Sequence, residues 1–139
     1  MTTKDKVSLH LAKLLHEKGY DKYSDEQYVE LKTGELAGEL GQWLGHCKLP
    51  LEICAYVEMT TDKKFIYVPT LDEAYEWILK QDPNWNVSVL WNNTVKGYYF
   101  VVQNTETGYE YKQPPTPKEN DTFKMYEWGI EHVLNRLDS

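Results

Sequence analysis

The chain has 139 residues and a mass of 16.4 kDa, so we predict a single domain spanning residues 1–139. Apolar residues make up 41% and aromatic residues 14% of the sequence, a composition that excludes a disordered tail. The formal net charge is −7 and Arg136 is the only arginine. This balance argues against nucleic-acid binding, which depends on basic surfaces.

The sequence also bears on where the protein acts. No stretch approaches the roughly 20 apolar residues of a membrane span. The apolar run near the N-terminus is interrupted by His10 and Lys13, so it indicates an amphipathic helix and not a signal peptide. Two cysteines, Cys47 and Cys54, do not form a disulfide framework. We therefore expect a cytoplasmic protein with reduced thiols and no membrane contact.

The first third of the chain predicts one helix and one short strand. Apolar residues recur on one helical face over residues 6–18, and Gly19 is typical of a helix C-cap. Alternation over residues 28–31 predicts a short strand that leads into a turn at Gly34. Residues 35–47 combine helical spacing with three glycines, which favours a loose loop with one helical turn.

The middle of the chain predicts a hairpin followed by a helix. Residues 51–59 and 65–68 are expected to be strands joined by residues 60–63. Thr70 and Glu73 form a capping-box pattern at the start of a helix over residues 70–80. Its predicted buried stripe consists of Leu71, Ala74, Tyr75 and Ile78, with Trp77 at the edge of that stripe, covering the rim of the core.

The last third predicts a three-strand meander and a final helix. The strands are expected at residues 87–91, 98–104 and 109–113, followed by a proline-rich loop over residues 113–120. Asp121 or Thr122 caps the last helix, whose apolar stripe is Phe123, Tyr126, Ile130, Leu134 and Leu137. The order of elements predicts an α+β fold: an antiparallel sheet, made of the meander plus shorter strands, with about three helices packed on one face.

The sequence contains no complete catalytic or metal-binding motif. There is no G-x-S-x-G elbow and no glycine-rich phosphate loop. His46, Cys47 and Cys54 supply three ligands where structural zinc takes four, and adjacent side chains point to different sides of an extended chain. His10, His16 and His132 are interpreted as surface or boundary residues. We predict no catalytic residues, no metal and no cofactor.

Aromatic residues crowd the meander, and two interpretations remain open. One is a sheet with one face packed under helices and the other covered with tyrosines. The other is a stacking platform for a sugar, a base or a peptide. The candidate binding residues on that platform are Trp91, Tyr99, Tyr109 and Tyr111.

Acidic residues concentrate between residues 25 and 60, and their role is also open. They form either a solvated acidic face or a surface that meets a basic partner. The residues are Asp25, Glu26, Glu30, Glu35, Glu39, Glu52 and Glu58.

Three segments resemble a family of small uncharacterised proteins found in phages and prophages of the Bacteroidetes. The first is the helix ending Leu14-Leu15-His16-Glu17-Lys18-Gly19-Tyr20. The second is Val68-Pro69-Thr70-Leu71-Asp72-Glu73-Ala74, followed by Trp77-Ile78-Leu79, a strand and the tyrosine-rich meander. The third is Tyr126-Glu127, which leads into Gly129-Ile130 and a final helix with Leu134 and Leu137. The resemblance implies a phage-type cytosolic accessory protein, and it transfers no catalytic or binding residue.

These observations lead to one expected function and one alternative. We expect a small non-enzymatic accessory protein that acts by binding another macromolecule, a host or phage protein. The alternative is a small-ligand or carbohydrate-binding module that uses the tyrosine-rich sheet face. The oligomeric state does not follow from the sequence.

Overall fold

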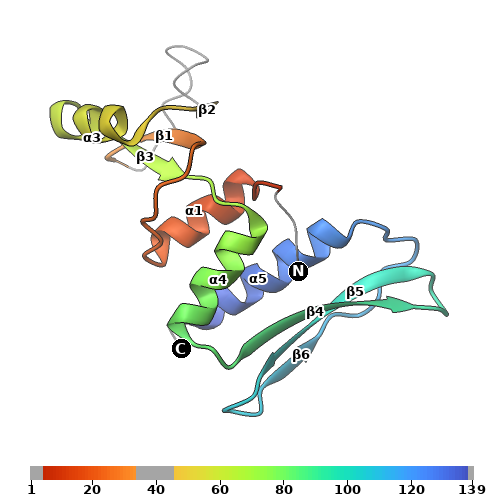
Figure 1. Cartoon of the computed structure of the whole chain (residues 1–139). Coiled ribbons are helices and arrows are strands. Elements are labelled where there is room, and N and C mark those ends of the chain that lie inside the picture. Colours follow the sequence, from red (N-terminus) through yellow and green to blue (C-terminus); the bar gives the residue numbers. More distant parts are fainter. Residues whose placement is uncertain (1–4, 34–45, 138–139) are drawn as a thin grey trace. The chain divides into compact units, whose positions relative to one another are not determined.

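The computed structural model describes residues 5–33 and 46–137 (Figure 1). The described residues divide into two compact units, an N-terminal unit that lies within residues 5–70 and a C-terminal unit that lies within residues 71–137. The described residues form four helices and two antiparallel sheets, which confirms the predicted α+β class. Most of the loop predicted over residues 35–47 lies outside the described residues.

The N-terminal unit is built on a three-stranded antiparallel sheet in the order β2-β1-β3. Its elements are α1 (Leu9–Glu17), β1 (Gln27–Leu31), β2 (His46–Cys47), α3 (Leu51–Thr60) and β3 (Lys63–Tyr67). Strand β1 lies in the centre, where Gln27 pairs with Cys47 on one side and with Tyr67 on the other. The strands predicted near residues 28–31 and 65–68 are therefore confirmed.

Helix α1 ends as its sequence predicts. Gly19 has a φ of +105°, a left-handed conformation that glycine adopts without steric cost. The amide of Tyr20 donates to the carbonyl of Leu15 at 2.9 Å, and the amide of Gly19 donates to His16 at 3.1 Å. These two bonds form a Schellman motif, and the buried side chains of Tyr20 and Leu15 accompany it.

The prediction of a strand over residues 51–59 is wrong, because these residues form helix α3. The apolar, β-favouring residues of this segment are typical of a strand, yet Leu51, Tyr56 and Met59 are exposed. The carbonyl of Pro50 accepts from the amides of Ile53 and Cys54 at 3.1 Å and so opens the first turn. In a helix, only the face that carries Cys54 needs to pack on the sheet.

The two helices that the structure describes in the N-terminal unit, α1 and α3, cover opposite faces of its sheet. Cys54 of α3 packs with Val29 and Phe65, which pair across the two strands. Lys13 of α1 instead reaches Glu30, on the other face, at 3.3 Å. The expectation that all helices share one face therefore does not hold here, since successive strand residues point to opposite sides and both sides carry apolar groups.

The C-terminal unit contains the predicted meander as a second antiparallel sheet in the order β4-β5-β6. Its elements are α4 (Leu71–Gln81), β4 (Trp85–Asn92), β5 (Gly97–Asn104), β6 (Glu110–Lys112) and α5 (Thr122–Arg136). The register pairs Val87 with Val102, and Val102 with Tyr111, so these side chains share one face. Figure 1 shows α5 lying across this sheet and beside α4.

Helix α5 starts where the sequence predicts but buries a different stripe. Asp121 is the N-cap, and its carboxylate accepts from the amide of Lys124 at 3.0 Å. Phe123, Tyr126 and Leu137 are only partly buried. The buried residues of α5 are Met125, Gly129, Ile130, Val133 and Leu134. The predicted stripe was rotated because it counted only large side chains and left out Gly129.

Gly129 is a point of close approach between α5 and the sheet. A Cβ atom added there would lie 2.5 Å from Cγ1 of Val87 and 3.4 Å from Cδ2 of Phe100. Both neighbours are buried, and a valine side chain has little rotamer freedom with which to move away. The helix backbone therefore rests directly on β4 and β5.

Helix α4 also differs from its predicted stripe. Leu71, Ala74 and Ile78 are buried as expected, but Trp77 is buried as well, with 7% of its surface exposed. Tyr75, predicted to be in the core, is only partly buried. Trp77 therefore belongs to the core of the unit and not to its rim, and Tyr75 is left to serve the pocket described below.

Gly129→Ala tests the close approach of α5 to the sheet. In an ordinary helix interior, replacing glycine by alanine stabilises the protein by about 0.5–1 kcal/mol. Here we expect the opposite sign, a loss of about 1–3 kcal/mol in the free energy of unfolding, because the new methyl group meets Val87. Urea unfolding measures the change, with Asn135→Ala on the exposed side of α5 as the control. A stabilised Gly129→Ala variant would contradict the packing.

Trp77→Ala tests whether this side chain is a core residue. We expect a loss of about 3–5 kcal/mol, the usual cost of truncating a buried aromatic side chain. The matched control is Trp128→Ala on α5, which should cost much less because 40% of Trp128 is exposed. Thermal and urea unfolding of both variants provide the comparison. Equal losses, or an unchanged melting temperature for Trp77→Ala, would contradict the assignment.

Candidate functional site

The structure does not bring the four candidate binding aromatics together. Tyr111 shares a face with Val102, toward α5, and Trp91 pairs with Tyr98 on that same face. Tyr99 lies on the opposite face, where the ammonium of Lys112 sits 5.6 Å from its ring centre. A ligand bound on one face of the sheet would therefore not touch all four residues.

Two of the candidate tyrosines pack against His132 of α5. The rings of Tyr111 and His132 stack with centroids 4.3 Å apart, and Tyr109 stacks on His132 at 6.0 Å. The hydroxyl of Tyr109 lies 2.7 Å from Nε2 of His132, and the guanidinium of Arg136 lies 4.0 Å from the Tyr109 ring centre. His132 is thus a boundary residue that ties the meander to α5.

The positions of the two cysteines favour a packing role over a reactive one. Cys54 is fully buried, and burial raises the pKa of its thiol to about 11. Burial also raises the pKa of the Cys47 thiol. Both groups are therefore protonated at neutral pH, which disfavours nucleophilic chemistry. Within residues 5–33 and 46–137, no group of three His, Cys, Asp or Glu side chains is placed to hold a metal ion.

Three carboxylates of the acidic stretch form ion pairs with lysines among the described residues. Lys6 lies 2.7 Å from Asp25, and Lys48 lies 3.5 Å from Glu26. The buried Glu30 receives two lysines, one from α1 at 3.3 Å and one from β3 at 3.1 Å. These three carboxylates therefore form ion pairs within the N-terminal unit.

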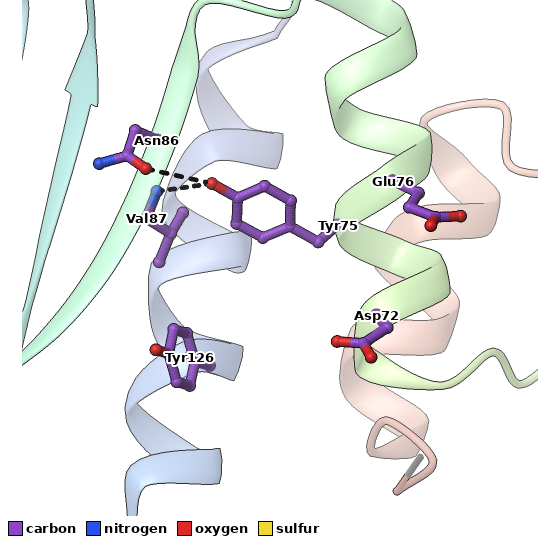
Figure 2. Close-up of a pocket in the computed structure, with 6 residues that line it drawn as sticks. All are labelled: Asp72, Tyr75, Glu76, Asn86, Val87 and Tyr126. Atoms are coloured by element: carbon purple, nitrogen blue, oxygen red, sulfur yellow. Dashed lines mark hydrogen bonds between the residues drawn. The ribbon is translucent and has the colours of Figure 1, made fainter. Parts of the chain in front are cut away.

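A different set of residues forms a pocket in the C-terminal unit, with a volume of about 340 Å³ (Figure 2). It lies between α4, the start of β4 and the first turns of α5. The residues that line it are Asp72, Tyr75, Glu76, Asn86, Val87 and Tyr126. Packing of α5 on the sheet places Tyr126 beside Val87, since Tyr126 lies one turn before Gly129 on the same side of the helix.

Tyr75 holds one wall of the pocket together. Its hydroxyl accepts a hydrogen bond from the amide of Val87 at 3.0 Å and lies 3.5 Å from Oδ1 of Asn86. Strand β4 is an edge strand of its sheet, so the Val87 amide points away from the ladder and needs a partner. Tyr75 supplies that partner from α4, as Figure 2 shows.

Hydrogen-bond acceptors dominate the chemistry of this pocket. Asp72 and Glu76 are one turn apart on α4, so their carboxylates lie on the same side of the helix. Oδ1 of Asp72 is enclosed and has no hydrogen-bond partner within the described ranges. No Lys, Arg or His is among the described residues that line the pocket. The pocket therefore offers negative charge and aromatic rings to a positively charged group.

The sequence contained a weak signal for this pocket. Asp72 and Glu76 stand four residues apart on a predicted helix, but helix surfaces produce such carboxylate pairs by chance. Asn86 and Tyr126 reach the pocket only through tertiary contacts, which no local pattern indicates. Tyr75 was counted as a core residue because its position fits the apolar period.

Comparison of the chain with protein-family models, with curated proteins and with solved structures gives no match. The resemblance to the phage and prophage family stays a prediction. Among the described residues, no helix is both long enough and apolar enough to span a membrane.

The contact of His132 with the two tyrosines predicts a pH dependence of stability. Burial, and then the charge of Arg136, hold the pKa of His132 below its ordinary value of 6.5. Because the unfolded chain takes up the proton more readily, the contribution of His132 is fully present above about pH 6.5 and is lost as the pH falls. Urea unfolding from pH 7.5 to 5 should therefore show the difference between wild type and His132→Gln shrinking on acidification. A difference that grows would mean that the folded protein prefers the protonated ring.

Proposed function

We propose that this chain is a non-catalytic accessory protein that binds another protein and accepts a basic side chain of that partner in the pocket of Figure 2. The observation that carries the proposal is the enclosed Asp72 oxygen without a hydrogen-bond partner, in a pocket whose described lining contains no cation. A lysine ammonium or an arginine guanidinium supplies the missing donors and the opposite charge.

The geometry of the pocket supports a side chain as its occupant. Two phenol rings, from Tyr75 and Tyr126, line a space otherwise bordered by carboxylates and an amide. A guanidinium or ammonium can lie against an aromatic face while it donates to a carboxylate, and the two interactions reinforce each other when water is excluded. Glu76, which is exposed, extends the negative charge toward solvent and favours the approach of a cation.

Helix α3 in the N-terminal unit supports a protein, and not a nucleic acid, as the partner. Four large apolar side chains of this helix are exposed, by 49% for Leu51, 46% for Ile53, 66% for Tyr56 and 85% for Met59. Exposed apolar groups gathered on one element are typical of protein-binding surfaces. The net charge of −7 disfavours a phosphate backbone. As the resemblance implies, we infer a phage-type protein that acts in the host cytoplasm.

The alternative function, a small-ligand or carbohydrate-binding module on the tyrosine-rich face, has one supporting observation. Trp91 and Tyr111 expose 45% and 37% of their surfaces on the face that also carries Tyr98 and Phe100. A sugar could stack on such rings. Tyr109 and Tyr111, however, are already engaged with His132, which leaves less free ring surface for a ligand.

Titration with single-residue probes tests the pocket. We expect Nα-acetyl-arginine methylamide and its lysine analogue to shift the backbone amide resonances of Asn86 and Val87 in a saturable way. The neutral analogue Nα-acetyl-glutamine methylamide should not. Asp72→Asn should weaken binding of the basic probes by about tenfold, since a hydrogen bond to a charged group contributes about 1.5 kcal/mol or more.

The matched control is Glu110→Gln, an equal change of charge at an exposed position of β6. It should leave the affinity for the basic probes unchanged. Thermal melts of both variants show whether the fold is intact. Equal shifts from basic and neutral probes, or an unchanged affinity of folded Asp72→Asn, would contradict the proposal.

A further inference from the structure

The N-terminal unit contains a second cavity whose character is the opposite of the first. It has a volume of about 330 Å³ and lies between α3 and the sheet. Its lining is almost entirely apolar and consists of Val29, Cys47, Leu49, Val57, Thr61, Lys63 and Phe65. Apolar pockets of this size, with few polar groups, are typical of sites for small molecules.

The buried side-chain amide of Gln27 fixes one wall of this cavity. Gln27 is fully buried, and its side-chain nitrogen donates to the carbonyls of Ser24 at 2.7 Å and Leu49 at 3.1 Å. Its side-chain oxygen accepts from the amide of Leu49 at 3.0 Å and lies 3.5 Å from the sulfur of Cys47. These bonds tie the segment of Cys47 to Leu49 to β1, so this wall of the cavity cannot move away from β1 without breaking them.

One charged group marks the rim of the cavity. Lys63 is partly buried, and it is the one charged residue among the described residues that line the cavity. No ion-pair partner of Lys63 occurs in the described part of the chain. Thr61 stands beside it, but its hydroxyl already donates to the carbonyl of Val57 and accepts from the amide of Lys63 at 3.1 Å. Lys63 is thus the polar group that a ligand would meet.

We propose that this cavity binds a small apolar carboxylate, with its hydrocarbon part against Val29, Val57 and Phe65 and its carboxylate at Lys63. The proposal is independent of the proposed function, which concerns the other unit. The apolar lining accounts for the affinity for a hydrocarbon chain or ring, because removing each methylene from water is favourable. The ammonium of Lys63 accounts for the selection of an anionic head group over a neutral or a cationic one.

Cys47 provides a direct readout, since its half-buried thiol lines the cavity while Cys54 is fully buried. Iodoacetamide alkylates Cys47 at pH 9 in the presence of decanoate, decanol or decyltrimethylammonium, each at a concentration at which it does not aggregate. Mass spectrometry then measures the rate of alkylation. We expect decanoate to slow the reaction by about tenfold when present at about ten times its Kd. Decanol should protect more weakly, and decyltrimethylammonium most weakly of the three.

Two variants separate the apolar lining from the charge. Val57→Trp fills the cavity and should abolish protection by decanoate. Lys63→Met keeps the stem but removes the charge, so it should weaken decanoate several-fold and leave decanol unchanged. Lys80→Met on α4 is the matched control and should change neither. The proposal would be overturned if decanoate gives no protection, if Cys47 of the ligand-free protein is as unreactive as Cys54, or if Lys63→Met, shown to be folded by its thermal melt, weakens decanol and decanoate equally.

Discussion

The C-terminal unit depends on one close contact, where the backbone of α5 rests on the sheet at Gly129. No side chain separates the two elements there, and Val87 and Phe100 fill the space that a Cβ atom would need. This approach sets the distance between α5 and strands β4 and β5. The core residues Ile130 and Val133 are buried because of it, and His132 comes within stacking distance of Tyr111.

The pocket follows from the same contact. Tyr126 precedes Gly129 by one turn, so the packing of α5 places it beside Val87. Helix α4 contributes the opposite wall and satisfies the outward-pointing amide of Val87 through the hydroxyl of Tyr75. The edge of β4 is thereby paired with a side chain at this position, which blocks strand addition there. The carboxylates of α4 are left at a pocket without an internal cation among its described residues.

The local parts of the fold could be predicted from the sequence, because their causes are local. Gly19 ends α1 in a Schellman motif, Asp121 caps α5, and the alternation and turns of the meander give three antiparallel strands. The composition of residues 51–59, apolar and β-favouring, predicts a strand where the structure has helix α3. An apolar segment of this length is expected to be buried, and a short buried segment is typical of a strand. In the structure most of those side chains are exposed instead.

The sites could not be predicted in the same way, since tertiary contacts create them. Gln27 has no local pattern that indicates burial, yet its amide fixes the wall of the apolar cavity. Tyr75, expected in the buried stripe of α4, is only partly buried, and its hydroxyl accepts from the amide of the edge-strand residue Val87. The candidate aromatics were selected by composition, and the register then placed Tyr99 on the face opposite Tyr111.

Helix α5 contacts the sheet through Gly129, and this contact builds the pocket. Nuclear Overhauser effects between the α protons of Gly129 and the methyl protons of Val87 measure this contact directly. The account predicts a strong cross-peak, because the backbone and the Val87 side chain are in van der Waals contact. It also predicts cross-peaks between Tyr126 and Val87, which line the same pocket. If the Gly129 cross-peak is absent while other α5-to-sheet cross-peaks are present, the helix is rotated or displaced, and the account of the pocket is wrong.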